Sequence, residues 1–469
     1  MSRLVYCLPL LLAACAVGPD YRRPELALPA RVTASDAAAP AAAPADLERD
    51  WWRRFGSEKL NRLVDEALRA SPTVEAGQAN LRAAQEAVAA QEGVALPQVS
   101  LGLNSNRQQT APVYASPLAN NAYIYTVHTA QLSVGFSPDV FGLTRRNVEA
   151  LTAQRDVAAE NLSATRLTVA ANVVLAAINV AGLSEQARLV RGQIETQRQA
   201  LEITQRLRRL GAASEADESA QQLQLASLEA NLPTLERQLA QQGHLLRALL
   251  GRYPVDPLDA SFSLAELRLP AELPTAVPAR LVETRPDVRA AEASLRSANA
   301  LVGVARANRL PTFSITASGV GQASSTLSQL FQSSNRFWSL TGGLTQPLFD
   351  GGTLAARERA AWAQRDAAAA LYRQTVLQAI QSVADSLAAA DGDRRLVARQ
   401  GEVLRAAERA ARIARDQVRL GDLSPLAALA AEQSQWQAGL ALAQARTAEL
   451  SDAVALCQAI SGTWVQEAP

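Results

Sequence analysis

The stretch LPQVSLGLN, residues 96 to 104, decides how the rest of the chain is interpreted. Its apolar side chains alternate with small or polar ones, the pattern of a β-strand with one apolar face. The stretch returns as LPTFSITAS, residues 310 to 318, displaced by 214 positions. A proline disfavours helix in the residue before it, so each Leu-Pro pair marks the end of a preceding helix. The chain therefore contains the same helix-to-strand transition twice.

Further matches keep the same order in both halves of the chain. They are Pro72-Thr73-Val74 with Pro286-Asp287-Val288, Gly182 with Gly392, Leu210 to Ser214 with Leu420 to Ser424, and Gly251 with Gly462, at offsets between 210 and 214. Matches in a fixed order and at a nearly constant offset predict an internal duplication. We expect repeat 1 to span 51–251 and repeat 2 to span 278–462. A linker over 252–277 joins them, and a tail covers 463–469.

Each repeat contains two segments in which apolar and small polar residues alternate. They predict strands at about 98–107, 126–137, 311–320 and 336–346. Segments of about ten residues with one apolar and one polar face are typical of membrane barrel strands, with lipid outside and water inside. Soluble hairpins with one buried face are the alternative.

Long segments rich in Ala, Leu, Arg, Gln and Glu follow the strands, and these residues favour helix. The predicted helices cover about 58–94, 143–210 and 215–250 in repeat 1, and 278–308, 354–420 and 425–460 in repeat 2. Gly211 and Gly421 stand where the long helices end, as helix C-caps do. Helices of this length predict two antiparallel coiled-coil hairpins.

The N-terminus predicts an exported protein. Residues 1–14 have the short positive start and apolar core of a signal peptide. Leu12-Ala13-Ala14-Cys15 resembles the bacterial lipobox, which implies that Cys15 carries diacylglycerol on its thiol and a palmitoyl group on its amino terminus. Ala16 follows, and an alanine there favours sorting to the outer membrane. A plain signal peptide with a chance cysteine is the alternative, and 15–50 is an Ala- and Pro-rich tether.

Composition argues against several classes of function. The 46 basic and 45 acidic residues nearly balance, which gives no indication of a nucleic-acid partner. His128 and His244 are far apart and no Cys/His cluster accompanies them, so no metal site is expected. No catalytic constellation and no cofactor motif is present, and we predict no enzyme activity and no cofactor.

After the signal, no stretch of eighteen residues is continuously apolar. A chain that crosses a bilayer without such a helix must do so as strands of a closed barrel. Because the smallest single-chain bacterial barrels have about eight strands, the four strands predicted here require several copies of the chain.

The motifs resemble those of the TolC-type outer-membrane factors, in the lipidated branch typified by OprM and NodT. The resemblance rests on the duplicated Pro-x-Val and Leu-Pro units and on Cys15 with Val17-Gly18-Pro19-Asp20-Tyr21, Trp51-Trp52, Phe55 and Gln346-Pro347-Leu348-Phe349-Asp350-Gly351-Gly352. It implies a mainly α fold with membrane β: four strands per chain in a shared trimeric twelve-strand barrel, continued by a periplasmic helical barrel.

The same resemblance implies a function. Such homotrimers are outer-membrane exit ducts of tripartite efflux pumps for small molecules such as drugs, served by a periplasmic adaptor and an inner-membrane transporter of the resistance-nodulation-division (RND) type. A duct for secreted protein or peptide is one alternative. A structural periplasmic coiled-coil lipoprotein that only spaces the envelope layers is the other.

The family pattern also points to candidate site residues at the hairpin tips. The expected adaptor-contact or turn positions are Gly211, Ser214, Gly421 and Ser424. Familiar members carry aspartates that form a constriction, but the matching positions here are Ala427 and Ala430, beside Leu426, which resembles an apolar gate residue. We expect closure by apolar packing around Leu426, or by Asp217 and Glu218 of the other hairpin.

Overall fold

The computed structural model describes residues 16–33, 50–114, 121–259, 261–269, 276–323 and 326–461. The predicted signal peptide, Cys15 and the C-terminal tail lie outside these residues. The chain divides into two compact units. The strand unit comprises Met1–Glu25, Asn80–Ala158 and Ala291–Tyr372, and the helical unit comprises Leu26–Ala79, Ala159–Ala290 and Arg373–Pro469.

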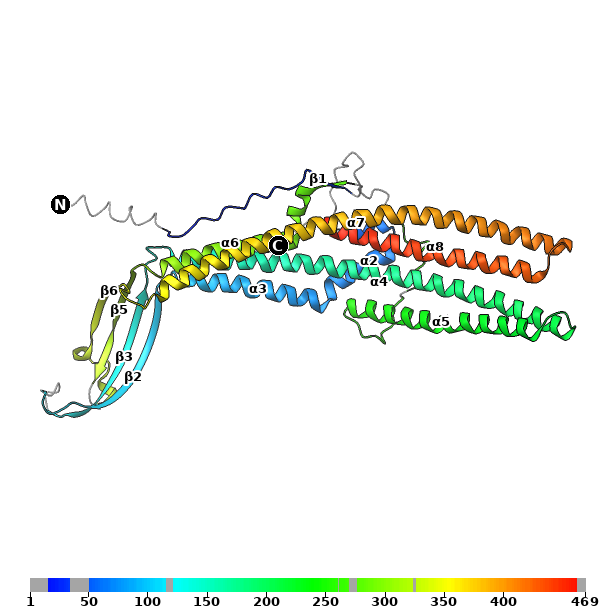
Figure 1. The fold of residues 1–469 in the computed structure, drawn as a ribbon. Coiled ribbons are helices and arrows are strands. Elements are labelled where there is room, and N and C mark those ends of the chain that lie inside the picture. Colours follow the sequence, from blue (N-terminus) through cyan, green and yellow to red (C-terminus); the bar gives the residue numbers. More distant parts are fainter. Residues whose placement is uncertain are drawn as a thin grey trace. The chain divides into compact units, whose positions relative to one another are not determined.

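The strand unit contains one antiparallel sheet of four strands (Figure 1). Its strands are β2 (Gln98–Gln109), β3 (Ile124–Phe136), β5 (Thr312–Ala323) and β6 (Trp338–Thr345), in the order β2-β3-β5-β6. Each repeat supplies one hairpin. Two short 3-10 turns, η3 (Leu327–Gln329) and η4 (Ser333–Asn335), connect β5 to β6. β2 and β6 are the edges of the sheet, and no strand in the described part of the chain pairs with their outer sides.

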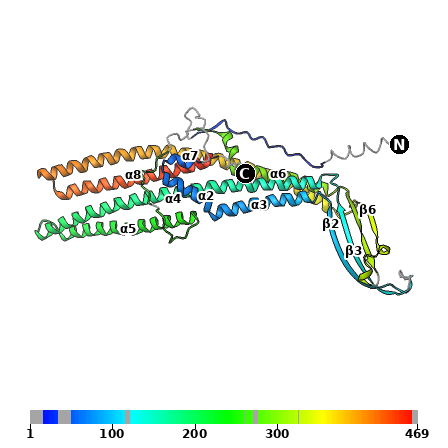
Figure 2. The ribbon, with the colours of Figure 1, turned by 180° about the vertical axis from the view of Figure 1, so that it is seen from behind.

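The helical unit contains most of two long antiparallel hairpins, whose first helices begin in the strand unit. In repeat 1, α4 (Leu143–Arg209) pairs with α5 (Glu215–Leu249), and in repeat 2, α7 (Thr353–Leu420) pairs with α8 (Pro425–Ile460). Figures 1 and 2, seen from opposite sides, both show the partners of each hairpin side by side. All four helices begin and end within one residue of the predicted positions, because Gly211 and Gly421 stop α4 and α7 in a left-handed conformation, with φ of 74° and 82°.

Small residues let the two hairpins pack closely in the helical unit. A Cβ atom on Gly182 of α4 would lie 2.4 Å from the Oγ1 atom of Thr447 in α8. One on Gly192 would lie 2.9 Å from the ring of Trp436. The Trp436 indole N–H donates a hydrogen bond of 3.0 Å to the Thr196 hydroxyl, so this partly buried polar atom is satisfied.

The helices expected over 58–94 and 278–308 were predicted wrongly as continuous. The first is split into α2 (Glu58–Ala70) and α3 (Pro72–Gly93), and the second into the 3-10 helix η2 (Ala279–Thr284) and α6 (Pro286–Ala307). Ser71 and Arg285, the residues between the pieces, are extended, with ψ of 123° and 139°. Each precedes a proline, which disfavours helix in that residue but suits the first turn of the next one.

Two further elements of the helical unit were not predicted. The 3-10 helix η1 (Trp51–Phe55) buries Trp51, Trp52 and Phe55. β1 (Arg31–Thr33) pairs antiparallel with β4 (Ala276–Pro278), which ties the segment before repeat 1 to the linker before repeat 2. Three-residue strands are too short to show an alternating pattern.

Within the described residues, α4 is the one helix that is long and apolar enough to cross a membrane. However, 67% of its most apolar window is buried inside the molecule, as in a core helix of a water-soluble domain.

Candidate functional site: the strap, the hairpin tips and the sheet faces

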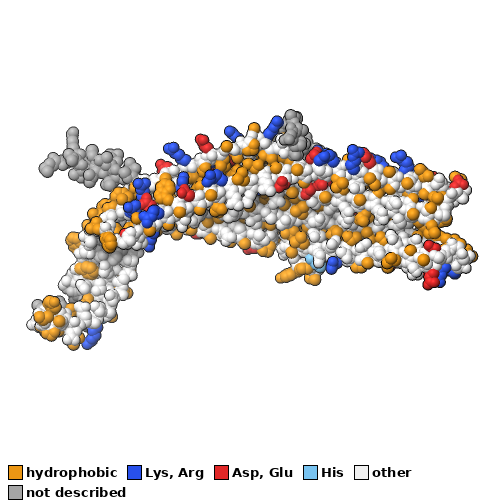
Figure 3. All heavy atoms as spheres, in the orientation of Figure 1, with side chains coloured by type: hydrophobic (Ala, Val, Ile, Leu, Met, Phe, Trp, Pro, Cys, Tyr) orange, Lys and Arg blue, Asp and Glu red, His pale blue; other side chains and the backbone are white. Residues whose placement is uncertain are grey.

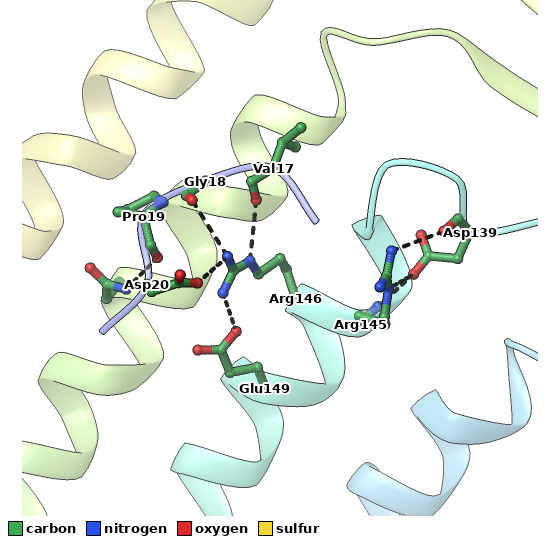
Figure 4. Close-up of polar contacts among 9 residues, drawn as sticks. Val17, Gly18, Pro19, Asp20, Asp139, Arg145, Arg146 and Glu149 are labelled. Atoms are coloured by element: carbon green, nitrogen blue, oxygen red, sulfur yellow. Dashed lines mark hydrogen bonds and ion pairs between the residues drawn. The ribbon is translucent and has the colours of Figure 1, made fainter. Parts of the chain in front are cut away.

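The segment 16–23, which we call the N-terminal strap, is held by one buried arginine (Figure 4). Arg146 of α4 has a side chain that is 7% exposed. Its Nε donates to the carbonyl oxygen of Val17 at 3.2 Å, and its Nη2 to a carboxylate oxygen of Asp20 at 2.9 Å. Its Nη1 donates to Glu149 at 2.7 Å, so the guanidinium bridges α4 and the strap.

Close backbone packing also fixes the N-terminal strap. Gly18 has a φ of 106°, and a Cβ atom placed on it would lie 2.4 Å from the Cα of Gly303 in α6. Only glycine fits at such a position. Asn299 donates a hydrogen bond of 2.8 Å to the Pro19 carbonyl, and the Val17 N–H donates one of 3.1 Å to the Phe141 carbonyl. The strap therefore starts one residue after Cys15 in a fixed position on the strand unit.

The strap ends in a carboxylate contact with α6. The Tyr21 hydroxyl donates to Glu292 at 3.3 Å, and Arg23 forms an ion pair with the same carboxylate at 3.1 Å. Burial and the neighbouring Glu292 raise the pKa of Tyr21, so the phenol stays a proton donor. The motif Val-Gly-Pro-Asp-Tyr was visible in the sequence, but its partners on α4 and α6 were not predicted.

The first hairpin tip is built around a reciprocal helix cap. The Ser214 hydroxyl oxygen accepts from the Asp217 N–H at 3.1 Å, and the Asp217 carboxylate accepts from the Ser214 N–H at 2.8 Å. The Ser214 hydroxyl also donates to this carboxylate, which lowers the pKa of Asp217. Glu218 accepts from Arg208 and from Gln205. Both carboxylates proposed as gate candidates thus have partners within their own hairpin.

The second tip keeps only half of that cap. Ser424 accepts from the Ala427 N–H at 3.3 Å, as Ser214 does from Asp217 at the matching position of repeat 1. Alanine has no carboxylate to return the bond, so this tip lacks the reciprocal contact. Leu426 is half-buried, whereas Ala427 and Ala430 are exposed.

The turns of the two tips are alike. The Ala212 N–H donates to the Leu207 carbonyl at 2.8 Å, and the Asp422 N–H to the Gln417 carbonyl at 2.9 Å. Both are the bonds of a Schellman motif, with glycine in the left-handed position before the donor. Gly211 and Gly421 therefore have a structural role as turn residues.

A groove of about 740 Å³ lies beside the second tip, between α4, α7 and α8. Its lining combines apolar side chains with several arginines: Gln199, Ile203, Arg412, Arg415, Asp416, Val418, Arg419, Pro425, Ala428, Leu429 and Glu432. Arg415 pairs with Glu432 at 3.5 Å, and Arg419 pairs with Asp416. The exposed guanidinium of Arg412 adds positive charge at the rim.

The sheet has two chemically different faces. Directly paired residues share a face, and one row across the four strands consists of Ser100, Ser133, Ser318 and Ser339. We call this side the serine face. The next row on the opposite, apolar face is Val99, Val134, Ala317 and Leu340.

Charge is nearly absent from the sheet. Arg107 is the single Asp, Glu, Lys or Arg in the four strands, and it lies on the side of the sheet opposite the serines. Figure 3 shows charged side chains mainly over the helices. Large side chains of the apolar face are exposed in the single chain, among them Leu101 at 69% and Trp338 at 82%. A row of exposed apolar side chains of this kind indicates a surface that contacts lipid or another protein.

The described residues contain no group of three or more His, Cys, Asp or Glu side chains that could hold a metal ion. Cys457 of α8 is buried, and burial raises the pKa of its thiol to about 12. It is therefore neutral and packs as a small apolar side chain.

Comparison with known proteins gives a consistent result. A model of the outer membrane efflux protein family matches residues 63–252 and 277–462. The outer membrane protein OprJ of Pseudomonas aeruginosa is 30% identical over 97% of this chain and 94% of its own length. The pyoverdine export outer membrane protein OpmQ of Pseudomonas putida is 29% identical over 90% of both chains. Among solved structures, the outer-membrane channel OprN gives a TM-score of 0.85 at 28% identity, over 96% of this chain and 100% of that one.

Proposed function

Because the chain belongs to the outer membrane efflux protein family, we propose that it is the exit duct of a tripartite efflux pump. It is an outer-membrane efflux protein of the TolC type that extends into the periplasm. The observation that carries the proposal is the sheet with one apolar and one neutral polar face, attached to two helical hairpins of more than 30 residues per helix. Such a sheet suits lipid on one side and water on the other.

The assembly is proposed to be a homotrimer. Four strands cannot enclose a water-filled channel, since the smallest single-chain barrels have about eight. Three copies supply twelve strands, closed where β6 of one copy pairs with β2 of the next. Because neighbouring strands of the sheet are all antiparallel, β2 and β6 run in opposite directions, as this closure requires.

The strap supports the proposed lipid anchor at Cys15. Arg146 and Gly303 fix the segment that begins at Ala16, the residue that follows the proposed lipidated cysteine. The anchor then serves as a second attachment to the outer-membrane lipid, in addition to the barrel.

The hairpin tips are the proposed adaptor-contact positions, with Gly211 and Gly421 shaping the turns and Ser214 and Ser424 capping the following helices. The groove with Arg412 beside the second tip adds a surface for a periplasmic adaptor with an acidic, apolar segment. At the periplasmic end, the proposed constriction is apolar, formed by Leu426 with Ala427 and Ala430, because Asp217 and Glu218 are engaged within the first tip.

The proposed cargo is small molecules handed over by an inner-membrane RND-type transporter. The relative OpmQ is named for export of pyoverdine, a small molecule, and this favours small cargo over secreted protein. No catalytic or cofactor role is assigned to the chain.

The test is complementation in a bacterium that lacks its own outlet channel but keeps a matching adaptor and transporter. Expression of this chain is expected to restore efflux of a fluorescent dye and resistance to several drugs. Restored secretion of a protein without dye efflux would favour the secretion duct. Failure of both, with a chain that leaves the membrane when Cys15 is replaced by Ser, would favour the structural lipoprotein.

A further inference from the structure

The chain contains two matching strand-to-helix junctions in the strand unit. The first junction, residues 137–142, links β3 to α4, and the second, residues 346–352, links β6 to α7. In each, a proline stands two residues after the strand, and an aspartate accepts hydrogen bonds from N–H groups at the start of the helix. Asp139 accepts from Thr144 and Arg145, and Asp350 accepts from Gly352 and Leu354.

The first junction packs against the neighbouring strand of its own chain. Phe141 lies with its ring centroid 6.4 Å from that of Phe313, which is near the start of β5. The Ser137 hydroxyl donates to the Phe313 carbonyl at 2.8 Å. Aromatic rings at this separation are in contact, so the junction is fixed on the strand beside β3.

The second junction also has a proline and an aspartate, but it is one residue longer, its aspartate stands three residues after the proline instead of one, and its apolar side chains are exposed. Leu348 is 94% exposed and Phe349 is 93% exposed, although Asp350 and two glycines of positive φ hold the turn. The difference follows from topology, because β3 has β5 beside it, whereas β6 is an edge strand.

The internal duplication indicates which residues would match Phe313 as a contact partner for the second junction. Phe313 of repeat 2 matches Val99 of repeat 1, in the Leu-Pro-x-x-Ser units 214 positions apart. Val99 is near the start of β2, the other edge strand, and is 65% exposed, while Leu96 just before it is 63% exposed. The chain thus has an exposed apolar surface at each edge of the sheet, one after β6 and one at the start of β2. The two surfaces correspond to the first junction and to Phe313, which contact each other within the chain.

We propose that the second junction binds a second copy of this chain, with Phe349 on Val99 and Leu96 of the neighbouring protomer. The contact repeats between copies what Phe141 and Phe313 do within one copy. The inference rests on the proposed homotrimer and names the contact that closes it. Pairing of β6 with the neighbour's β2 brings the end of one strand beside the start of the other, as β3 and β5 already do.

A second pair of matched residues, in the helical unit, shows the same asymmetry. Gly182 of α4 packs tightly against Thr447, whereas its counterpart Gly392 of α7 has no atom within 4 Å of where its Cβ would lie. Here too a repeat 1 residue is covered within the chain, and the matching repeat 2 residue faces open space. Gly392 is thus a further position that lacks a contact within its own chain.

The experiment is thiol cross-linking of the purified full-length protein in a Cys457→Ala background. Phe349→Cys combined with Val99→Cys is treated with a bifunctional thiol reagent of short reach. The expected product is a covalent ladder of two and three chains, absent from either single variant. The matched control combines Phe349→Cys with Leu103→Cys, on the same strand and face but about 13 Å further along β2, and is expected to stay uncross-linked.

A second measurement does not depend on cysteine geometry. Phe349→Ala is expected to lower the temperature at which the oligomer dissociates, and Phe331→Ala, another exposed phenylalanine of the strand unit, is expected to leave it unchanged. A stable wild-type trimer that gives neither the cross-link nor the lowered dissociation temperature overturns this contact alone. A wild-type protein that is monomeric by native mass spectrometry overturns the proposed trimer itself.

Discussion

The Nε atom of Arg146 donates a hydrogen bond of 3.2 Å to the carbonyl oxygen of Val17, two residues after the cysteine expected to carry lipid. One buried guanidinium thus connects the segment that begins at Ala16 to the first turn of the longest helix of repeat 1. The same side chain forms ion pairs with Asp20 and Glu149.

Replacement of Arg146 by Ala is expected to release the strap and to destabilise the protein by about 2 kcal/mol, because the hydrogen bonds of the charged guanidinium to the Val17 carbonyl and to Glu149 are lost. Lysine at this position should recover only part of the loss, since an ammonium group cannot reproduce the planar fork of donors. Denaturant unfolding, together with proteolysis of the strap, measures both effects. Arg145→Ala, which removes a half-exposed side chain next to it, is the control expected to change little.

Gly18→Ala is expected to cost about 2 kcal/mol, because residue 18 has a φ of 106° and touches the backbone of Gly303. Gly93→Ala provides the comparison, as Gly93 ends α3 with no atom within 4 Å of its Cβ position. That variant should be neutral or slightly stabilising. Equal loss of stability in the two variants would argue against the close contact of Gly18 with α6.

Burial and the neighbouring carboxyl group of Asp452 in α8 raise the pKa of Asp393 in α7 to about 6. A raised pKa means that the folded state binds more protons than the unfolded one between the ordinary aspartate pKa of about 3.9 and pH 6. Stability should therefore fall as the pH rises through this window. Asp393→Asn is expected to raise the unfolding temperature at pH 8 and to change it little at pH 3, below this window, as followed by circular dichroism.

Ala427→Asp should complete the cap of the second tip, as Asp217 does in the first, and add about 0.5 kcal/mol to the stability of α8. In a trimer it also places three carboxylates around the periplasmic end. Single-channel recordings are expected to show weak block of the wild type by divalent cations and strong block of the variant. Strong block of the wild type that disappears in Asp217→Asn with Glu218→Gln would instead assign the constriction to the first tip.

Neighbouring residues 317 and 318 test which side of the sheet faces water. Ser318→Cys is expected to react with a positively charged thiol reagent added in water, and the added charge should reduce conductance and shift selectivity toward anions. Ala317→Cys, on the apolar face, should be shielded by lipid and unreactive. The reverse pattern of reactivity would contradict the assignment of the serine face to the channel.

The sequence predicted best those features that depend on residues close together in the chain. Schellman glycines and long runs of helix-forming residues predicted the ends of α4 and α7 closely, and alternation located all four strands. The helix breaks at Ser71 and Arg285 were not predicted, although the following Pro72 and Pro286 disfavour helix at these residues. The spacing of apolar residues continues across each break. The Ser214-x-x-Asp217 cap was also readable from the sequence, as a serine three residues before an acidic side chain.

Contacts between distant segments were not predictable in the same way. Nothing near Val17 and Pro19 indicates that Arg146 and Asn299 donate hydrogen bonds to their carbonyl oxygens, since those two residues lie more than 120 positions away. The pairing of β1 with β4 likewise joins two segments that are far apart in the sequence. Alternation likewise predicts that a strand has two faces, but only the register aligns four serines from two repeats in one row.

The edge strands β2 and β6 affect how prone the chain is to aggregate before it assembles. An unpaired strand edge is a template for pairing with any other exposed strand, and this chain has one on each side of the sheet. A newly exported copy is therefore most prone to aggregate while it is alone. We expect its yield to depend on how quickly copies meet at the membrane and on periplasmic chaperones that cover the edges in transit.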